Sequence, residues 1–166
     1  MARNTSPSSA DLASICLTDS QLKPYLKSGL GGLRKSDRSR VKVPYSSLLT
    51  CSIDLDASLK HAYPQANRWD YAIEYDRRTY FLEVHPASTS EISSMIQKVE
   101  FLERWAGSHL PKLLEPQPGV SVRCYYWVAS GSTDLRISQT SPQARKLAMK
   151  HIKPVGRIWD YSKLIK

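Results

Sequence analysis

Residues 69–85 alternate between apolar and polar side chains on both sides of a short polar segment, and this pattern constrains the fold more than any other feature. The alternating apolar positions are Tyr71, Ile73, Tyr75, Tyr80, Leu82 and Val84. Successive side chains of a strand point to opposite faces of a sheet, so the pattern predicts two paired strands with one aromatic and aliphatic face. The polar segment 76–79 is expected to form the turn.

The other face of this hairpin carries polar side chains. They are Asp70, Glu74, Glu83 and His85. With a four-residue turn, Tyr75 pairs with Tyr80. In that register Asp70 lies opposite His85, with Glu83 beside them. Because Glu83 falls in the otherwise apolar segment 80–84, it is expected in a covered strand, where a carboxylate is costly unless it is paired or metal-bound.

An amphipathic helix is predicted directly after the hairpin. Ser88 followed by Glu91 is a capping-box pattern, and Gly107 suits a stop after about Ala106. The apolar stripe of this helix consists of Ile92, Met95, Ile96, Val99, Leu102 and Ala106. Its spacing is that of one helical face packed on a core.

The rest of the chain predicts further helices and strands. The patterns indicate a weak helix over 10–26, a short helix over 54–63 capped by Asp54, a strand within 120–129, a helix from Ser141 to His151 and a last strand over 155–161. Helices and strands therefore mix in an α/β fold. The aromatic run 125–127 is expected in the core rather than stacked on bases.

The composition fits one soluble domain. Of 166 residues, 41% are hydrophobic and 23% charged, and no apolar run is long enough to span a bilayer. We expect a disordered tail over 1–10 and a single domain over 11–166. The N-terminus lacks a secretory pattern, which favours a cytoplasmic protein. Cys16, Cys51 and Cys124 are expected to be reduced.

The net charge of +9 is concentrated in two flanks. Residues 23–42 and 143–166 each contain seven Lys or Arg and one acid, whereas 43–142 contain nine Lys or Arg and eleven acids. Basic flanks around an acidic centre suit a protein that holds a polyanion over a metal site, although a solvated surface explains the charge equally well. The basic loop covers about 27–42. The candidate nucleic-acid contacts are Arg34, Lys35, Arg38, Arg40, Arg145, Lys146 and Lys150.

The hairpin and the helix after it resemble the PD-(D/E)xK, or restriction-endonuclease-like, nuclease superfamily over about 54–161. Asp70 matches the first acid of the motif, and Glu83-Val84-His85 matches its second half. His85 stands where lysine is usual, and Asn67-Arg68-Trp69 replaces the proline before the first acid. The resemblance implies a mixed central sheet flanked by helices and a metal-dependent nuclease that acts on DNA or RNA.

The chemistry needs a cation between carboxylates and phosphate. Mg²⁺ or Mn²⁺ held by Asp70 and Glu83, with the Val84 carbonyl as a ligand by resemblance, would supply a hydroxide and neutralise phosphoryl charge. His85 would act as a base or bind a softer metal, but it provides no permanent cation at neutral pH. Lys98 is a candidate substitute, because the lysine has moved to this helix in some members of the superfamily.

Each of these assignments has a structural alternative. Lys98 would face solvent and contact its helical neighbours, and Asp54 and Asp56 would cap a helix rather than bind metal. Asp70 and His85 would form an inter-strand ion pair, with Glu83 in solvent. At the level of function, the alternatives are a catalytically inactive nuclease-like fold that binds nucleic acid or a protein partner, and a small interaction protein.

Overall fold

The computed structural model describes residues 11–120, 122–132 and 135–164, and their fold is α/β. Its helices and strands are α1 (Leu12–Leu17), β1 (Leu26–Ser28), β2 (Val41–Lys42), β3 (Leu49–Asp54), α2 (Leu55–Lys60), β4 (Tyr71–Tyr75), β5 (Arg78–His85), α3 (Ile92–His109), β6 (Tyr125–Ala129), α4 (Pro142–Met149), β7 (Ile152–Pro154) and β8 (Trp159–Asp160). The expected tail over 1–10 lies outside the described residues. No helix in the described ranges is long and apolar enough to cross a membrane.

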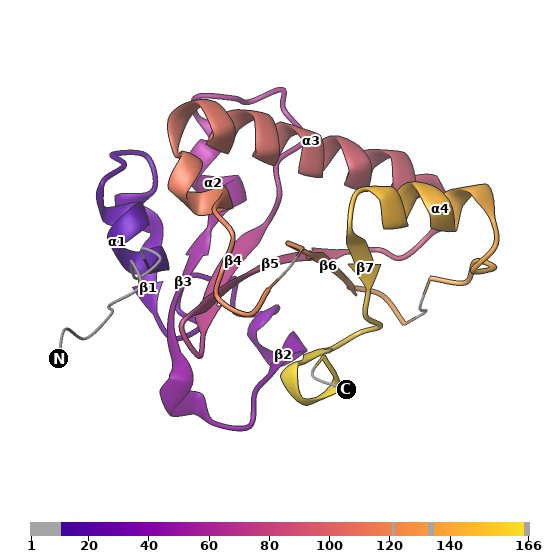
Figure 1. The fold of residues 1–166 in the computed structure, drawn as a ribbon, viewed down its shortest axis with the longest axis horizontal. Helices are drawn as coiled ribbons and strands as arrows, with labels where there is room; N and C mark the ends of the chain where they lie inside the picture. The colour runs from indigo at the N-terminus through magenta and orange to yellow at the C-terminus, as the bar shows by residue number, and fades with distance from the viewer. Residues whose placement is uncertain (1–10, 121, 133–134, 165–166) are drawn as a thin grey trace, which may run out of the picture.

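A mixed six-stranded sheet forms the centre of the molecule, in the order β1-β3-β4-β5-β6-β7 (Figure 1). The pairs β1–β3, β3–β4 and β4–β5 are antiparallel. After α3 crosses over, β6 pairs parallel with β5 and β7 pairs parallel with β6. The sheet therefore changes from antiparallel to parallel at β5, the strand that carries Glu83.

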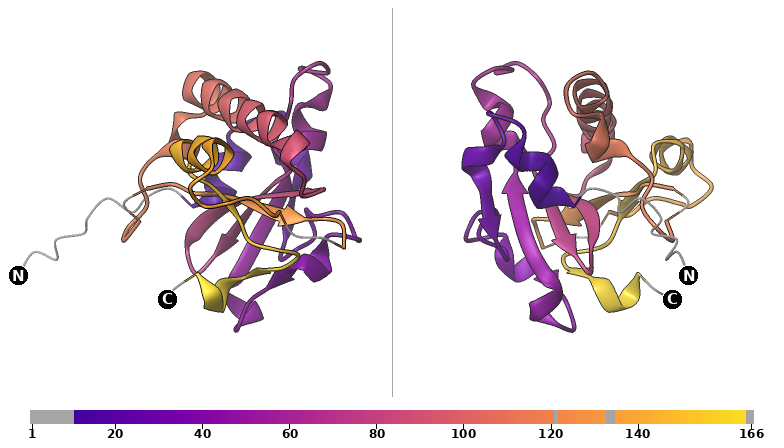
Figure 2. Two further views of the ribbon diagram at one scale, coloured as in Figure 1. Left: turned by 90° about the vertical axis from the view of Figure 1, so that its right-hand side faces the viewer. Right: turned by 60° about the vertical axis from the view of Figure 1, so that its left-hand side comes forward.

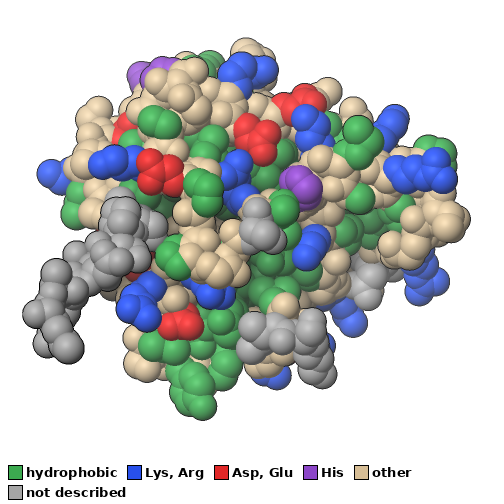
Figure 3. Space-filling model, viewed as in Figure 1, with side chains coloured by type: hydrophobic (Ala, Val, Ile, Leu, Met, Phe, Trp, Pro, Cys, Tyr) green, Lys and Arg blue, Asp and Glu red, His purple; other side chains and the backbone are tan. Residues whose placement is uncertain are grey.

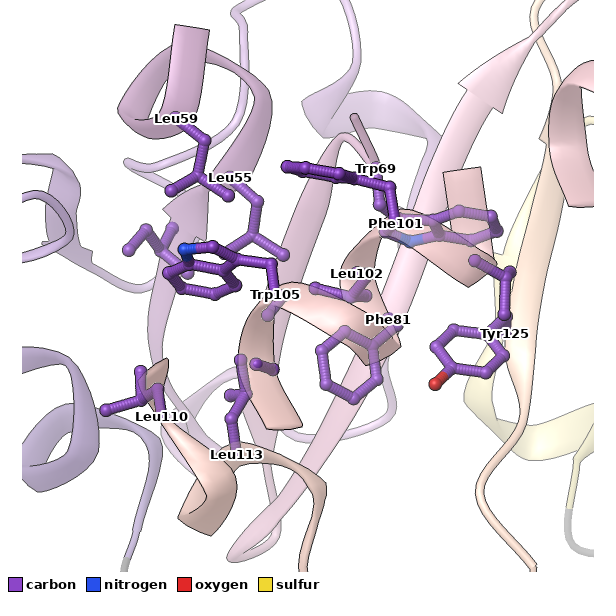
Figure 4. Packing of buried hydrophobic residues seen from close by; sticks show 14 of the residues in the cluster. Leu55, Leu59, Trp69, Phe81, Phe101, Leu102, Trp105, Leu110, Leu113 and Tyr125 are labelled. Carbon is purple, nitrogen blue, oxygen red and sulfur yellow. The ribbon is translucent and has the colours of Figure 1, made fainter. Parts of the chain in front are cut away.

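The helices cover one face of the sheet and irregular chain covers the other (Figures 1 and 2). Buried side chains of the four α-helices join Ala72 and Phe81 of the hairpin in one hydrophobic cluster. Figure 4 shows Trp69, Phe81 and Trp105 packed together in this layer. The opposite face, with Tyr71, Ile73 and Leu82, packs against the basic loop and the C-terminal segment. That cover includes a small parallel sheet of β2 and β8.

The hairpin is present, but its predicted register is wrong. Tyr75 pairs with Arg78 rather than with Tyr80, because the turn has two residues instead of four. Asp76 and Arg77 both have positive φ, 48° and 61°, as a tight type I′ turn requires. Asp76 suits the first position of this turn, but the pair Asp-Arg does not signal it, because the second position usually holds glycine. Because the register is shifted by two residues, every side chain of the hairpin stays on its predicted face of the sheet.

Other predicted boundaries also need correction. The last predicted strand, 155–161, is replaced by β7 before it and the two-residue β8 at its end. Gly107 does not stop α3, which runs to His109 before Pro111. The weak helix over 10–26 is confined to α1, followed by a 3-10 turn and β1, and neither β1 nor β3 was predicted.

Several local predictions are confirmed. The Asp54 side chain caps α2 by accepting from the Ala57 N–H at 2.7 Å, and the Ser141 hydroxyl caps α4 by accepting from the Ala144 N–H at 3.1 Å. The aromatic run 125–127 is buried in β6. All three cysteines are free thiols, with Cys16 and Cys51 buried.

Candidate functional site

Asp70 and Glu83 lie next to each other at one end of the β4–β5 ladder. Because Tyr71 pairs with Leu82, the next step along the hairpin brings Asp70 to Glu83 instead of to His85. The Asp70 N–H donates to Glu83 Oε2 at 2.9 Å, and the Val84 N–H donates to Asp70 Oδ2 at 3.1 Å. At the end of the ladder, the two carboxylates therefore accept hydrogen bonds from backbone N–H groups, as carbonyl oxygens do within the ladder.

Both carboxylates are withdrawn from water. Glu83 is 0% exposed and Asp70 is 5% exposed. Burial and the charge of Asp70 raise the pKa of Glu83 to about 8, although Lys98 opposes the shift. Burial also raises the pKa of Asp70, against the opposing effects of Lys98 and of the Val84 N–H. The local positive charge thus does not fully compensate the two acids, and a further cation would stabilise their ionised forms.

Lys98 reaches this pair from α3. Its Nζ contacts Glu83 Oε1, and its side chain is only 13% exposed. The alternative of a solvent-facing Lys98 is therefore wrong, and so is that of a Glu83 exposed to solvent. The helix that follows the hairpin therefore brings a lysine to Glu83.

His85 lies on the same side of the site but pairs with a residue that the sequence did not indicate. Its Nε2 is 2.8 Å from Glu91 Oε2, and its Nδ1 is 3.8 Å from Glu83 Oε1. The ion pair with Asp70, the structural alternative for His85, is absent from the contacts of the described residues, so that alternative is wrong. The Ser88–Glu91 capping box is also wrong, since neither side chain caps the helix start. Because the Ser-x-x-Glu spacing matches a capping box, the sequence did not indicate that Glu91 contacts His85.

A second charged group borders Asp70. Arg34, in the basic loop, lies 3.3 Å from Asp56 Oδ2 and 3.9 Å from Asp70 Oδ1. The Arg68 Nε donates to Asp56 Oδ1 at 2.9 Å. Asp56 thus pairs with two arginines, and Asp54 caps α2. These contacts fit structural roles for both residues better than roles as extra metal ligands. The ion pairs of Asp56 with Arg34 and Arg68 were not predicted.

The basic candidates outside the site divide into engaged and exposed side chains. Arg40 donates to the carbonyls of Ala129 and Ser130 at 2.8 and 2.7 Å, so it fastens the basic loop to the end of β6. The Arg38 Nε donates to the Leu33 carbonyl, and Lys150 pairs with Glu100 at 3.2 Å. Lys35, Arg145 and Lys146 are exposed, and Arg38 is exposed as well despite its hydrogen bond. Around α4, Figure 3 shows Lys and Arg side chains without acids between them.

The donors at Asp70 and Glu83 suit a hard divalent cation that keeps much of its water. Magnesium is commonly held by one or two carboxylates, with water and substrate phosphate as its other ligands. In the described ranges no three His, Cys, Asp or Glu side chains form a group that could hold a metal. Asp70 and Glu83 supply carboxylate oxygens, which are the ligand type that such an ion prefers.

The larger cavities lie away from these residues. One of about 500 Å³ is lined by Arg78, Tyr80 and Arg123 at the opposite end of β5. Another of about 520 Å³ lies between α3 and α4, with Ile96 and Lys146 in its wall. A third, of about 540 Å³, is lined by Leu147 and Ile152. We place the candidate site at Asp70 and Glu83 because the two carboxylates with raised pKa values and the largely buried Lys98 meet there. A polymeric substrate does not need an enclosed pocket.

Comparison with known proteins adds no further evidence. A scan against family models, a search of curated proteins and a search of solved structures each give no match to this chain.

Proposed function

We propose that the protein is a divalent-metal-dependent nuclease with a restriction-endonuclease-like core, in which Asp70 and Glu83 hold Mg²⁺ or Mn²⁺. The observation that carries this proposal is the contact of Lys98 with a wholly buried Glu83 beside Asp70. Two acids and a lysine are the residue types of the superfamily's motif, with the lysine supplied by α3. The mixed sheet and the hairpin that bears both acids are consistent with the same assignment.

The chain's own residues divide the work of phosphodiester hydrolysis. The bound ion would neutralise phosphoryl charge and activate water. Lys98 adds a fixed positive charge beside Glu83, and His85 orients the attacking water. Arg34, at 53% side-chain exposure and 3.9 Å from Asp70, is placed to contact a phosphate at the site. The exposed Lys35, Arg145 and Lys146 hold the nucleic-acid backbone farther away. Three free thiols fit the reducing cytoplasm.

A cleavage assay tests this proposal. Wild-type protein is incubated with double-stranded DNA, single-stranded DNA or RNA, in Mg²⁺, Mn²⁺ or EDTA. We expect cleavage only with a divalent ion, and a loss of about 100-fold or more in Glu83→Gln and Asp70→Asn. Glu74→Gln is the matched control, because Glu74 lies on the same face but bonds to Thr50 and Leu12. Cleavage that survives in Glu83→Gln or in EDTA would contradict the assigned site.

One observation favours a second candidate, a nuclease-like fold that binds nucleic acid without cutting it. Lys98 and Arg34 already lie against the two acids, as they would in a site whose carboxylates serve only the fold. This candidate predicts salt-sensitive retention of nucleic acid that Glu83→Gln leaves intact and Lys146→Ala weakens. Retention without any cleavage by the wild type would favour it.

A further inference from the structure

A cavity of about 500 Å³ lies at the other end of β5 from the candidate site, and the proposed function makes no use of it. Arg78 begins β5 and Glu83 lies near its end, about 16 Å farther along the strand. The volume falls within the range of roughly 300–1,000 Å³ that is typical of pockets for small molecules. The lining combines apolar, phenolic and charged side chains, among them Leu114, Val122, Tyr126, Glu115, Arg78 and Arg123.

Side-chain hydrogen bonds fix the wall that follows α3. Gln117 Oε1 accepts from the Thr79 N–H at 2.7 Å, and its Nε2 donates to the Thr79 carbonyl at 3.1 Å. Because Thr79 precedes the part of β5 that pairs with β6, the amide of Gln117 takes the place of a strand neighbour. The Arg123 guanidinium donates to the Leu114 carbonyl in the same wall. The wall is therefore held in place by the protein itself, which lowers the cost of ordering it around a ligand.

The two arginines of the lining differ in their contacts. The Arg123 Nε donates to the Tyr125 hydroxyl at 2.8 Å, and its Nη2 lies 3.6 Å from Glu103 Oε1. No acid among the residues that the structure describes forms an ion pair with Arg78. Its guanidinium lies against Gly119, which has a φ of 75° and where a Cβ would be 2.7 Å from Arg78 Nη2. The cavity thus contains a half-buried positive charge that a bound anion would neutralise.

Neutral donors and acceptors accompany this charge. Tyr80 lies two residues after Arg78 and therefore on the same side of β5. Burial raises the pKa of Tyr126 to about 12, and burial also raises the pKa of Tyr80 against the effect of Arg78, so both hydroxyls remain protonated donors at neutral pH. The exposed carboxylate of Glu115 is an acceptor for hydroxyl groups, and Val122 adds exposed apolar surface.

We propose that this cavity binds a nucleoside monophosphate, with the phosphate at Arg78 and the sugar and base along the apolar and phenolic wall. A guanidinium binds phosphate through paired N–H donors, and Glu115 accepts from the ribose hydroxyls. Inorganic phosphate alone would leave most of the 500 Å³ unfilled. The proposal does not depend on the nuclease function, because the residues of the candidate site are not part of this lining.

The Cys124 thiol reports on occupancy, because it lines the cavity and is partly exposed, whereas Cys16 and Cys51 are buried. The folded protein is alkylated with iodoacetamide in the presence of each of the four ribonucleoside 5′-monophosphates, and the modification of Cys124 is followed by mass spectrometry. We expect at least one nucleotide to slow alkylation, with half of the effect reached below about 1 mM. The corresponding nucleoside, and inorganic phosphate, should each need about 10-fold higher concentrations or more.

Matched variants locate the effect in the cavity. Arg78→Gln should raise the concentration for half-protection about 10–100-fold. Arg77→Gln changes an exposed neighbour that does not line the cavity and should match the wild type. Val122→Trp, at an exposed position, should weaken protection by filling the cavity, and it provides the test if Arg78→Gln does not fold. Glu83→Gln should retain full protection, because binding here is separate from the candidate site.

Three results would overturn the proposal. The first is the absence of Cys124 protection by all four nucleotides up to about 10 mM. The second is equal protection by the nucleoside or by inorganic phosphate, which would exclude a requirement for both parts of the ligand. The third is unchanged protection in Arg78→Gln, or in Val122→Trp if Arg78→Gln does not fold. The cleavage result has no bearing on any of these outcomes, so this proposal and the nuclease function can fail separately.

Discussion

Replacing Glu83 with glutamine should remove part of the pH dependence of the unfolding free energy in the metal-free protein. Burial and Asp70 raise the folded-state pKa of Glu83 from 4.5 to about 8. The group therefore contributes stability that is fully present below the unfolded pKa and is lost as pH rises through about 8. At about 1.4 kcal/mol per pKa unit, the ionised carboxylate lowers the free energy of unfolding by several kcal/mol in alkaline solution.

Glutamine keeps the shape of the side chain and stays neutral. Lys98 loses its charged partner but is partly exposed, so solvent offsets some of this loss. The unfolding free energy of Glu83→Gln, relative to wild type, should thus rise by about 2–5 kcal/mol between pH 5 and pH 9. Urea unfolding in EDTA, followed by circular dichroism at both pH values, measures this difference. A difference that does not change with pH would refute the reasoning.

Three local features give further predictions, each checked by urea unfolding. Arg77→Gly should stabilise the protein by about 0.5–1 kcal/mol, because residue 77 has a φ of 61° that glycine adopts without strain. No gain would argue against the two-residue turn. Arg40→Ala should destabilise it by about 1–3 kcal/mol, because the carbonyls of Ala129 and Ser130 lose a charged donor; an unchanged midpoint would show that solvent replaces the arginine. Ser141→Ala should cost about 1 kcal/mol through loss of the α4 cap, and a neutral effect would contradict that cap.

Periodicity predicted the faces of the hairpin correctly because the side-chain repeat of a strand is two residues. A register error of two residues leaves each side chain on its face, so Asp70 and Glu83 still share one. The error came from the turn, where Asp76 and Arg77 adopt left-handed conformations that their sequence does not signal. Only the pairing of Tyr75 with Arg78 reveals that Asp70 meets Glu83 rather than His85.

Long-range contacts explain what the sequence could not show. The spacing of α3 identified its apolar face but not that Lys98, near the edge of the stripe, contacts Glu83 of β5. Glu91 follows a local capping pattern, yet a hydrogen bond to His85 prevails over it. β3 was missed although Leu49, Cys51 and Ile53 alternate with polar residues as in a strand. The hydroxyls of Thr50 and Ser52 find their partners, Glu74 and the Gly32 N–H, only in the folded protein.

Diffraction from crystals soaked in Mn²⁺ tests the central claim most directly, because the anomalous signal identifies the ion and its ligands. The account predicts a peak between the carboxylates of Asp70 and Glu83, within about 2.0–2.3 Å of an oxygen from each. The peak should be absent in crystals of Glu83→Gln. Manganese bound only elsewhere, with Glu83 still in contact with Lys98, would contradict a metal site at these two acids.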